Sequence, residues 1–144
     1  MQLRLTFPAL TLIILMLGCG ELGNDTGMIS QRIGQAVREP GTREVDISKL
    51  TTFGWEYFYF FKPGTPRETI CSFIGANRNN CGRVIRYDKV PATHVALLFG
   101  LNGSLTHTEL HALANGEFDF ELPKDGVRKA QSVFQVRRTA GGIW

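Results

Sequence analysis

The sequence predicts an α+β domain, with an antiparallel sheet of about four to five strands and one or two short helices packed on one face. Three features support this class: an aromatic run over residues 53–61, a helix start directly after it, and two apolar segments joined by Asn102-Gly103. With 144 residues, of which 43% are hydrophobic and 20% charged, the chain is expected to form one globular core.

Charge is spread evenly along the sequence. The net charge of +3 comes from 16 basic and 13 acidic residues, and no run of like charges is long enough to mark a nucleic-acid-binding surface. We therefore expect no nucleic-acid partner.

Residues 1–18 are predicted to be a signal peptide. Arg4 and the amino terminus give a weakly basic start, and residues 10–17 supply an apolar segment. Thr6, Pro8 and Thr11 interrupt the apolar character, which makes the segment a poorer candidate for a membrane-spanning helix of about 20 residues.

The leader ends in Leu15-Met16-Leu17-Gly18-Cys19, which resembles a bacterial lipobox. In lipoproteins of this class the cysteine sulfur carries diacylglycerol, the leader is cleaved, and the new amino terminus is acylated, commonly with palmitate. The resemblance implies that Cys19 is lipidated and anchors the protein in the cell envelope. Gly20 implies the outer membrane, with the domain facing the periplasm. The alternative is an ordinary signal peptide followed by an incidental cysteine.

Residues 19–28 are predicted to be the lipidated cysteine and a flexible tether, because they are rich in Gly, Asn, Asp and Thr. A single domain then covers residues 29–144. It is expected to begin with an amphipathic helix, since Ile29, Ile33 and Val37 recur at helical spacing and Pro40-Gly41 ends the segment.

Aromatic residues occupy most positions of the stretch TFGWEYFYFFKPGT, which predicts a strand buried on both faces. An aromatic platform for a glycan or nucleobase is the alternative. Thr65, Pro66 and Glu68 then form a capping-box pattern, with Thr65 as the N-cap. The short helix that follows is expected to present an apolar face and to end at a glycine: Ile70, Phe73, Ile74 and Gly75.

Residues 44–75, EVDISKLTTFGWEYFYFFKPGTPRETICSFIG, resemble a segment of small bacterial lipoproteins of undefined activity. In those proteins a Trp-bearing aromatic strand precedes a helix that starts with Thr and Pro. The shared pattern concerns packing, so it implies architecture and carries over no functional residue.

Cys71 and Cys81 remain once Cys19 is assigned to lipid. An even number of cysteines in an oxidising compartment predicts a disulfide between them, closing an Asn- and Arg-rich loop over residues 72–80. The alternative is that both are separate buried thiols. A metal site is less favoured because no matching second thiol pair is present.

Asn102-Gly103 is predicted to be a two-residue hairpin turn between the strands THVALLFGL and SLTHTELHAL. Counting back from a pair of Leu101 with Ser104 places Ala96 opposite Glu109, and His94 opposite His111. The core face would then consist of alternate residues from both strands: Val95, Leu97, Phe99, Thr106, Thr108 and Leu110.

A three-residue turn over residues 114–116, with Gly116 left-handed, is expected to add a further strand to this meander. The resulting pairs would be Ala112 with Phe118, Leu110 with Phe120, Asp119 with His111, and Glu121 with Glu109. Residues 123–126 would turn the chain toward a last strand near residues 132–138.

This register would gather His94, His107 and His111 on one sheet face with acidic side chains. Imidazoles and carboxylates suit zinc, and the candidate ligands of a metal or small-ligand site are His94, His111, Glu109 and Asp119. We favour the alternative of a solvated polar face, because an antiparallel sheet commonly has one wet side.

Enzyme signatures such as G-x-S-x-G, a Gly-rich phosphate loop or H-E-x-x-H are absent from the sequence. We therefore expect no catalytic residues and no cofactor. The favoured function is a membrane-anchored envelope protein that binds another envelope protein or has a structural role. The other is a lipoprotein that binds a metal or small ligand through the histidine face.

Overall fold

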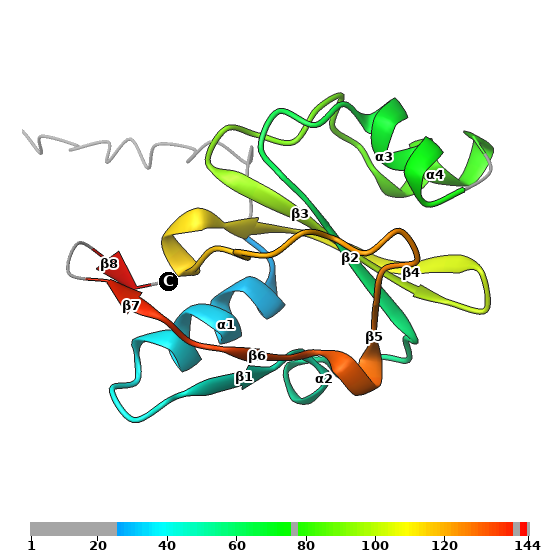
Figure 1. Ribbon diagram of the computed structural model, residues 1–144. Helices are drawn as coiled ribbons and strands as arrows, with labels where there is room; N and C mark the ends of the chain where they lie inside the picture. Colours follow the sequence, from blue (N-terminus) through cyan, green and yellow to red (C-terminus); the bar gives the residue numbers. More distant parts are fainter. Residues whose placement is uncertain (1–25, 76–77, 140–141, 144) are drawn as a thin grey trace, which may run out of the picture.

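The protein is described by a computed structural model that covers residues 26–75, 78–139 and 142–143 (Figure 1). Its main sheet is antiparallel, with strand order β4-β3-β2-β5. These strands are β2 (Tyr57–Phe61), β3 (His94–Leu101), β4 (Ser104–Ala112) and β5 (Val127–Arg128). Two smaller pairs join β1 (Glu44–Asp46) with β6 (Val133–Gln135), and β7 (Arg138–Thr139) with β8 (Gly142–Ile143). The predicted α+β class is confirmed.

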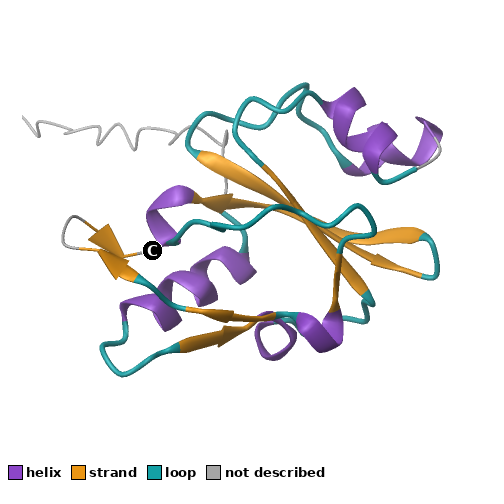
Figure 2. Ribbon diagram, viewed as in Figure 1, coloured by secondary structure: helices purple, strands orange, loops and turns teal. Residues whose placement is uncertain are grey.

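Helices cover both faces of the main sheet, whereas the sequence suggested one (Figure 2). On one face lie α1 (Met28–Arg38), α2 (Ile47–Leu50) and the β1–β6 pair, which enclose a first core around Phe58, Leu97 and Phe99. On the other lie α3 (Arg67–Phe73) and α4 (Arg78–Val84), which enclose a second core around Ile70 and Leu98. Single-turn 3-10 helices η1 (Leu113–Asn115) and η2 (Lys129–Gln131) follow β4 and β5.

Helix α1 confirms the first predicted helix, and its buried face contains Ile29, Ile33 and Val37. The domain includes the last residues of the predicted tether, however. Thr26 forms a parallel bridge with Leu110 at the edge of β4, and Gly27 N–H donates to the Leu110 carbonyl at 3.0 Å. Residues 26–28 therefore belong to the domain. The predicted leader and Cys19 lie outside the described residues.

The aromatic run forms a shorter strand than its composition suggested, because pairing with β3 begins at Tyr57. Its side chains belong to the two cores. Trp55 and Phe58 are buried in the first core, where Trp55 contacts the Phe99 ring edge-on and Phe58 stacks on it. Phe61 is buried in the second core. These rings therefore pack in the interior and do not form an exposed binding platform.

The predicted capping box does not form, although the helix after it does. Pro66 is the N-cap of α3, and no side chain caps the helix. The Thr65 hydroxyl donates instead to the Lys62 carbonyl at 2.7 Å, within the turn that precedes the helix. The backbone N–H of Arg67 donates to the Asp88 carbonyl at 2.8 Å, so the first N–H group of the helix is satisfied by the backbone of a later segment. The helix ends as predicted, with Gly75 left-handed at φ 64°.

The hairpin turn is confirmed, with Asn102 and Gly103 at φ 52° and 74°. A bulge then shifts the register by one residue: Gly100 pairs with Leu105, but Phe99 pairs with His107. Beyond the bulge Leu97 lies opposite Glu109, Val95 opposite His111, and His94 opposite Ala112. The predicted pairs of Ala96 with Glu109 and His94 with His111 were therefore wrong.

The predicted third meander strand is also absent from the described residues. After η1, Gly116 adopts φ 120° and ψ 159°, and residues 117–122 make no ladder with β4. This segment crosses the first core instead, where Phe118 stacks on Phe60 with ring centroids 5.1 Å apart. Asp119 and Glu121 are exposed on it. The pairs predicted for residues 118–121 were wrong, whereas the turn at 123–126 is confirmed by a 2.9 Å bond from Gly126 N–H to the Pro123 carbonyl.

Candidate functional site

The predicted histidine face does not form as one face, because His107, Glu109 and His111 point to the first core, whereas His94 alternates with Val95 and belongs to the other face. A one-residue shift in register moves every side chain of a strand to the opposite face. The bulge in β4 therefore places His107, Glu109 and His111 on the side of Phe99 and Leu97, beneath α1. His111 is 0% exposed and His94 is 7% exposed, so the solvated-face interpretation was wrong.

Glu109 caps helix α1 from the neighbouring strand. Gly27, the N-cap residue, has no side chain to satisfy the first N–H groups of the helix. The carboxylate of Glu109 accepts from Ser30 N–H at 2.8 Å, and His107 Nε2 lies 3.1 Å from its other oxygen. A Cβ atom at Gly27 would overlap this carboxylate. Glu109, which the sequence offers as a metal-ligand candidate, thus holds the helix to the sheet.

A second polar contact ties α1 to the turn after β4. The buried Ser30 hydroxyl accepts from Ala112 N–H at 3.0 Å and from Asn115 Nδ2 at 3.1 Å. Asn115 Oδ1 in turn accepts from the Arg38 guanidinium. Buried polar groups are stable only when paired, and this network pairs each of them. Its role is to position α1.

His111 forms a further buried polar contact on the face that α1 covers. Its Nε2 lies 2.7 Å from the Gly116 carbonyl, which fixes Nε2 as the protonated nitrogen. Burial lowers the pKa of His111, and this effect outweighs the opposing influence of the Gly116 hydrogen bond and the Glu109 carboxylate. The Nδ1 atom has no hydrogen-bond partner among the described residues.

The four candidate metal ligands do not converge. His94 contacts the hydroxyl of Thr93 at 2.9 Å, whereas Asp119 forms an exposed ion pair with Arg137. Within the described part of the chain, no three His, Cys, Asp or Glu side chains are grouped so that they could hold a metal ion. The juxtaposition that motivated the metal hypothesis depended on the wrong register.

The two remaining cysteines lie where a bridge can form. The sulfur atoms of Cys71 and Cys81 are at bonding distance, with their Cα atoms 5.8 Å apart. Cys71 is in α3 and Cys81 in α4, so they connect two helices. The predicted loop over residues 72–80 was wrong in this respect, because α3 extends to Phe73 and α4 begins at Arg78.

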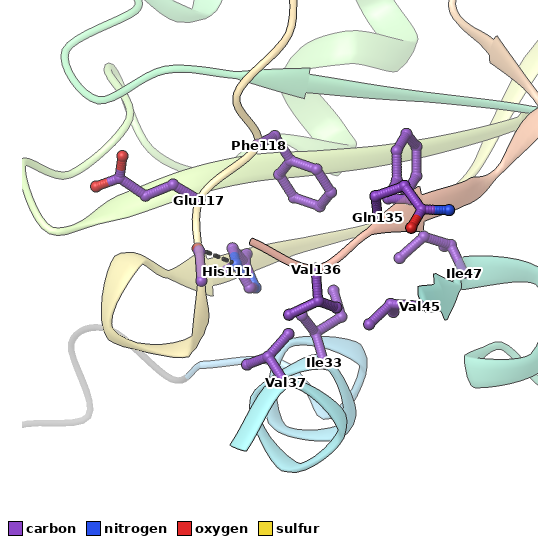
Figure 3. Close-up of a pocket in the computed structure, with 11 residues that line it drawn as sticks. Ile33, Val37, Val45, Ile47, His111, Glu117, Phe118, Gln135 and Val136 are labelled. Atoms are coloured by element: carbon purple, nitrogen blue, oxygen red, sulfur yellow. Dashed lines mark hydrogen bonds between the residues drawn. The ribbon is translucent and has the colours of Figure 1, made fainter. Parts of the chain in front are cut away.

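An apolar cavity of about 50 Å³ lies beside His111, between α1, the β1–β6 pair and Phe118 (Figure 3). Sequence reasoning missed it, because the cavity depends on the segment after Gly116 crossing the sheet, and a continued meander was expected. The sequence predicted a positive φ at Gly116, but it did not predict that the chain would leave β4 there and cross the first core. Asn115 and Ser30 were missed as well, since isolated polar residues carry no pattern.

Comparison with known proteins adds no relative. No protein-family description matches the chain, and no curated protein or solved structure matches it either. Over the residues that the structure describes, none of the helices has the length and apolar character needed to span a bilayer.

Proposed function

We propose that the protein is a bacterial envelope lipoprotein, anchored in the outer membrane through lipid on Cys19, whose domain serves as a protein-interaction or structural module. The observation that carries the proposal is the lipobox-like segment 15–19, a few residues ahead of the described domain, whose first described contact is at Thr26. Residues 20–25 span at most about 20 Å even when fully extended. A lipid anchor at Cys19 would thus keep the domain close to the membrane surface.

The cysteine pair supports the same compartment. Disulfides form and persist in the periplasm and outside the cell, and are rare in the cytosol. Cys71 and Cys81 have the separation that a bridge requires, and Cys81 is 0% exposed. A bridged pair would stabilise the α3–α4 cover of the second core after export.

An interaction or structural role accords with the use of the polar side chains. Ser30, Glu109 and Asn115 are paired with each other or with the backbone. Their contacts hold α1 on the sheet. A partner would therefore bind the solvent-exposed surface of the domain.

Membrane fractionation tests the anchor. Cys19→Ser is expected to leave the leader unprocessed or to release the domain into the soluble fraction, because no lipid can be attached. Cys71→Ser is the matched control and should remain in the membrane fraction. Wild-type protein found wholly in the soluble fraction, with no lipid mass on Cys19, would contradict the proposal.

A photoreactive residue at a defined position tests the interaction role. Phe73 on α3 is 40% exposed and Val133 on β6 is 47% exposed, and partner proteins commonly cover such apolar side chains. A discrete crosslinked product in intact envelopes is expected from one of these positions. Lys124, exposed in a polar turn, is the control position. Equal labelling from all three positions would argue against a specific partner.

A further inference from the structure

Positive charge is concentrated in the α3–α4 pair and the connections on either side of it. Residues 62–90 have a net charge of +4, whereas the whole chain has +3, so the remaining residues together are slightly acidic. No two of the cations are adjacent, which is why no run of like charge marks this stretch in the sequence. The stretch contains six basic residues and two acidic ones: Lys62, Arg67, Arg78, Arg83, Arg86 and Lys89, with Glu68 and Asp88.

The fold brings the two connections together. Gly64 N–H donates to the Val90 carbonyl at 2.8 Å, and Val90 N–H donates to the Thr65 carbonyl at 3.0 Å. Figure 1 shows the connection after β2 and the one that leads into β3 above the ends of these strands. Arg67 pairs with Asp88 at 3.3 Å. Four exposed cations, which we call the basic surface, form no ion pair with another described residue: Lys62, Arg83, Arg86 and Lys89.

The basic surface lies toward the end of the sheet that the predicted anchor approaches. The strand β2 ends where β3 begins, because Phe61 pairs with Ala96. Thr26 reaches the same end, since its hydroxyl lies 3.5 Å from His94 Nε2. The six residues between Thr26 and Cys19 span at most about 20 Å. Lipid on Cys19 would therefore hold this end of the domain close to the membrane.

An exposed apolar side chain lies at this end as well. Met28 is 62% exposed, more than the other large apolar side chains that the structure describes. It follows Gly27, whose N–H donates to the Leu110 carbonyl near the end of β4. Cations combined with exposed apolar side chains are typical of segments that lie on an anionic membrane surface.

We propose that the basic surface rests on the anionic lipid headgroups of the membrane that carries the protein and thereby orients the anchored domain. Clusters of Lys and Arg close to a membrane are attracted by its negative surface potential. The proposal rests on the proposed lipid anchor, because a few exposed cations attract lipid weakly and salt screens that attraction. The β1–β6 pair, on the other face of the sheet, would stay accessible to a partner protein.

The experiment measures lysine acetylation by mass spectrometry in the full chain, purified from membranes and reconstituted into vesicles. The vesicles consist of phosphatidylcholine alone or of phosphatidylcholine mixed with phosphatidylglycerol. Lys62 and Lys89 should react several-fold more slowly when anionic lipid is present, because the headgroups cover them. Lys49 and Lys124 are exposed outside the basic surface and should react equally in both kinds of vesicle. High salt should remove the protection.

Paired charge reversals test whether position matters. Arg83→Glu combined with Arg86→Glu should abolish the protection of Lys62 and Lys89. Arg43→Glu combined with Arg128→Glu changes the net charge equally at exposed positions elsewhere and should retain the protection. The salt dependence of the wild type tests the proposal without any variant, so the test does not depend on the folding of the first pair.

Several results would overturn the proposal. Equal reaction of Lys62 and Lys89 in the two kinds of vesicle is one, and equal protection of Lys49 is another. Protection found in native membranes but not in anionic vesicles would identify an acidic protein as the partner instead. Flotation with phosphatidylcholine vesicles tests the anchor separately. Protein that does not float with them lacks the proposed anchor, whereas protein that floats without lysine protection keeps the anchor and refutes the basic surface.

Discussion

At the scale of single residues, three small residues in α1 and at its N-cap decide how the helix meets the sheet. Gly27, Ser30 and Gly34 lie against Glu109 and Asn115, and the two glycines leave room for those polar side chains. The apolar spacing of α1 predicted the helix, but it did not show that polar groups fix its position. That contact depends on residues about 80 positions away in the sequence.

Gly34→Ala is expected to destabilise the protein. A Cβ atom at Gly34 would lie 2.6 Å from Asn115 Cγ, so Asn115 would have to move and release Ser30. The free energy of unfolding should fall by about 1–3 kcal/mol. Gly82→Ala on α4 is the matched control, because nothing lies within 4 Å of its Cβ position and Ala is the better helix former by about 1 kcal/mol. Equal effects of both changes in urea unfolding would argue against the crowding at Gly34.

Acid is expected to destabilise the fold through its buried histidines. Burial lowers the pKa of His111 and of His94. In the unfolded chain both would bind a proton near pH 6.5, whereas the folded state resists protonation. Their contribution to the free energy of unfolding is therefore complete above about pH 6.5 and is lost as the pH falls toward the lowered pKa values.

Unfolding by urea between pH 8 and pH 5 measures this effect. His111→Gln should flatten the pH dependence, since the Gln amide can still donate to the Gly116 carbonyl without titrating. Some dependence should remain because of His94. A pH profile identical to that of the wild type would show that His111 does not resist protonation in the folded state.

At the scale of elements, local patterns predicted α1, α3 and the Asn102-Gly103 turn. Each depends on residues that are close in the sequence: an apolar period of 3.6, a glycine stop, and a type of turn that requires positive φ. The sequence could not locate the bulge in β4, because bulges depend on strand twist and on packing against distant elements. A single extra residue, Thr106, was enough to exchange the two faces of the strand.

The β1–β6 pair was missed for a related reason. Its strands have three residues each, and the paired residues are 87 to 91 positions apart, from Asp46 with Val133 to Glu44 with Gln135. Strands this short carry little periodicity. The cavity beside His111 was missed with them, since β1, β6 and the crossing segment form most of its wall.

The α3–α4 pair gives the prediction at this scale. We expect Cys71 and Cys81 to resist alkylation in denatured, unreduced protein and to react after reduction. Replacing both with Ser should lower the free energy of unfolding by somewhat less than about 3 kcal/mol, as the closure of a short loop implies. Reductant should destabilise the wild type and leave the double variant unchanged. Two freely alkylated thiols without reductant would contradict the bridge.

At the scale of the whole molecule, the domain combines two cores on opposite faces of one thin sheet. The first is built from aromatic rings beneath α1, and the second is smaller and includes Cys81. This arrangement explains why β3 is buried along almost its whole length, from His94 to Gly100. A strand covered on both faces reads as a continuous apolar run.

The position of the anchor gives the last prediction. Residues 15–19 resemble a lipobox, and in lipoproteins of that class the residue after the cysteine determines which membrane receives the mature protein. By this resemblance Gly20 implies passage to the outer membrane. Gly20→Asp should therefore move the protein to the inner-membrane fraction, while Gly20→Ala should not. Equal free energies of unfolding for the two variants would show that neither change alters the stability of the domain. Separation of the two membranes on a density gradient measures the distribution. An unchanged distribution of the Asp variant would mean that Gly20 does not direct the protein to the outer membrane, even if lipid on Cys19 is confirmed.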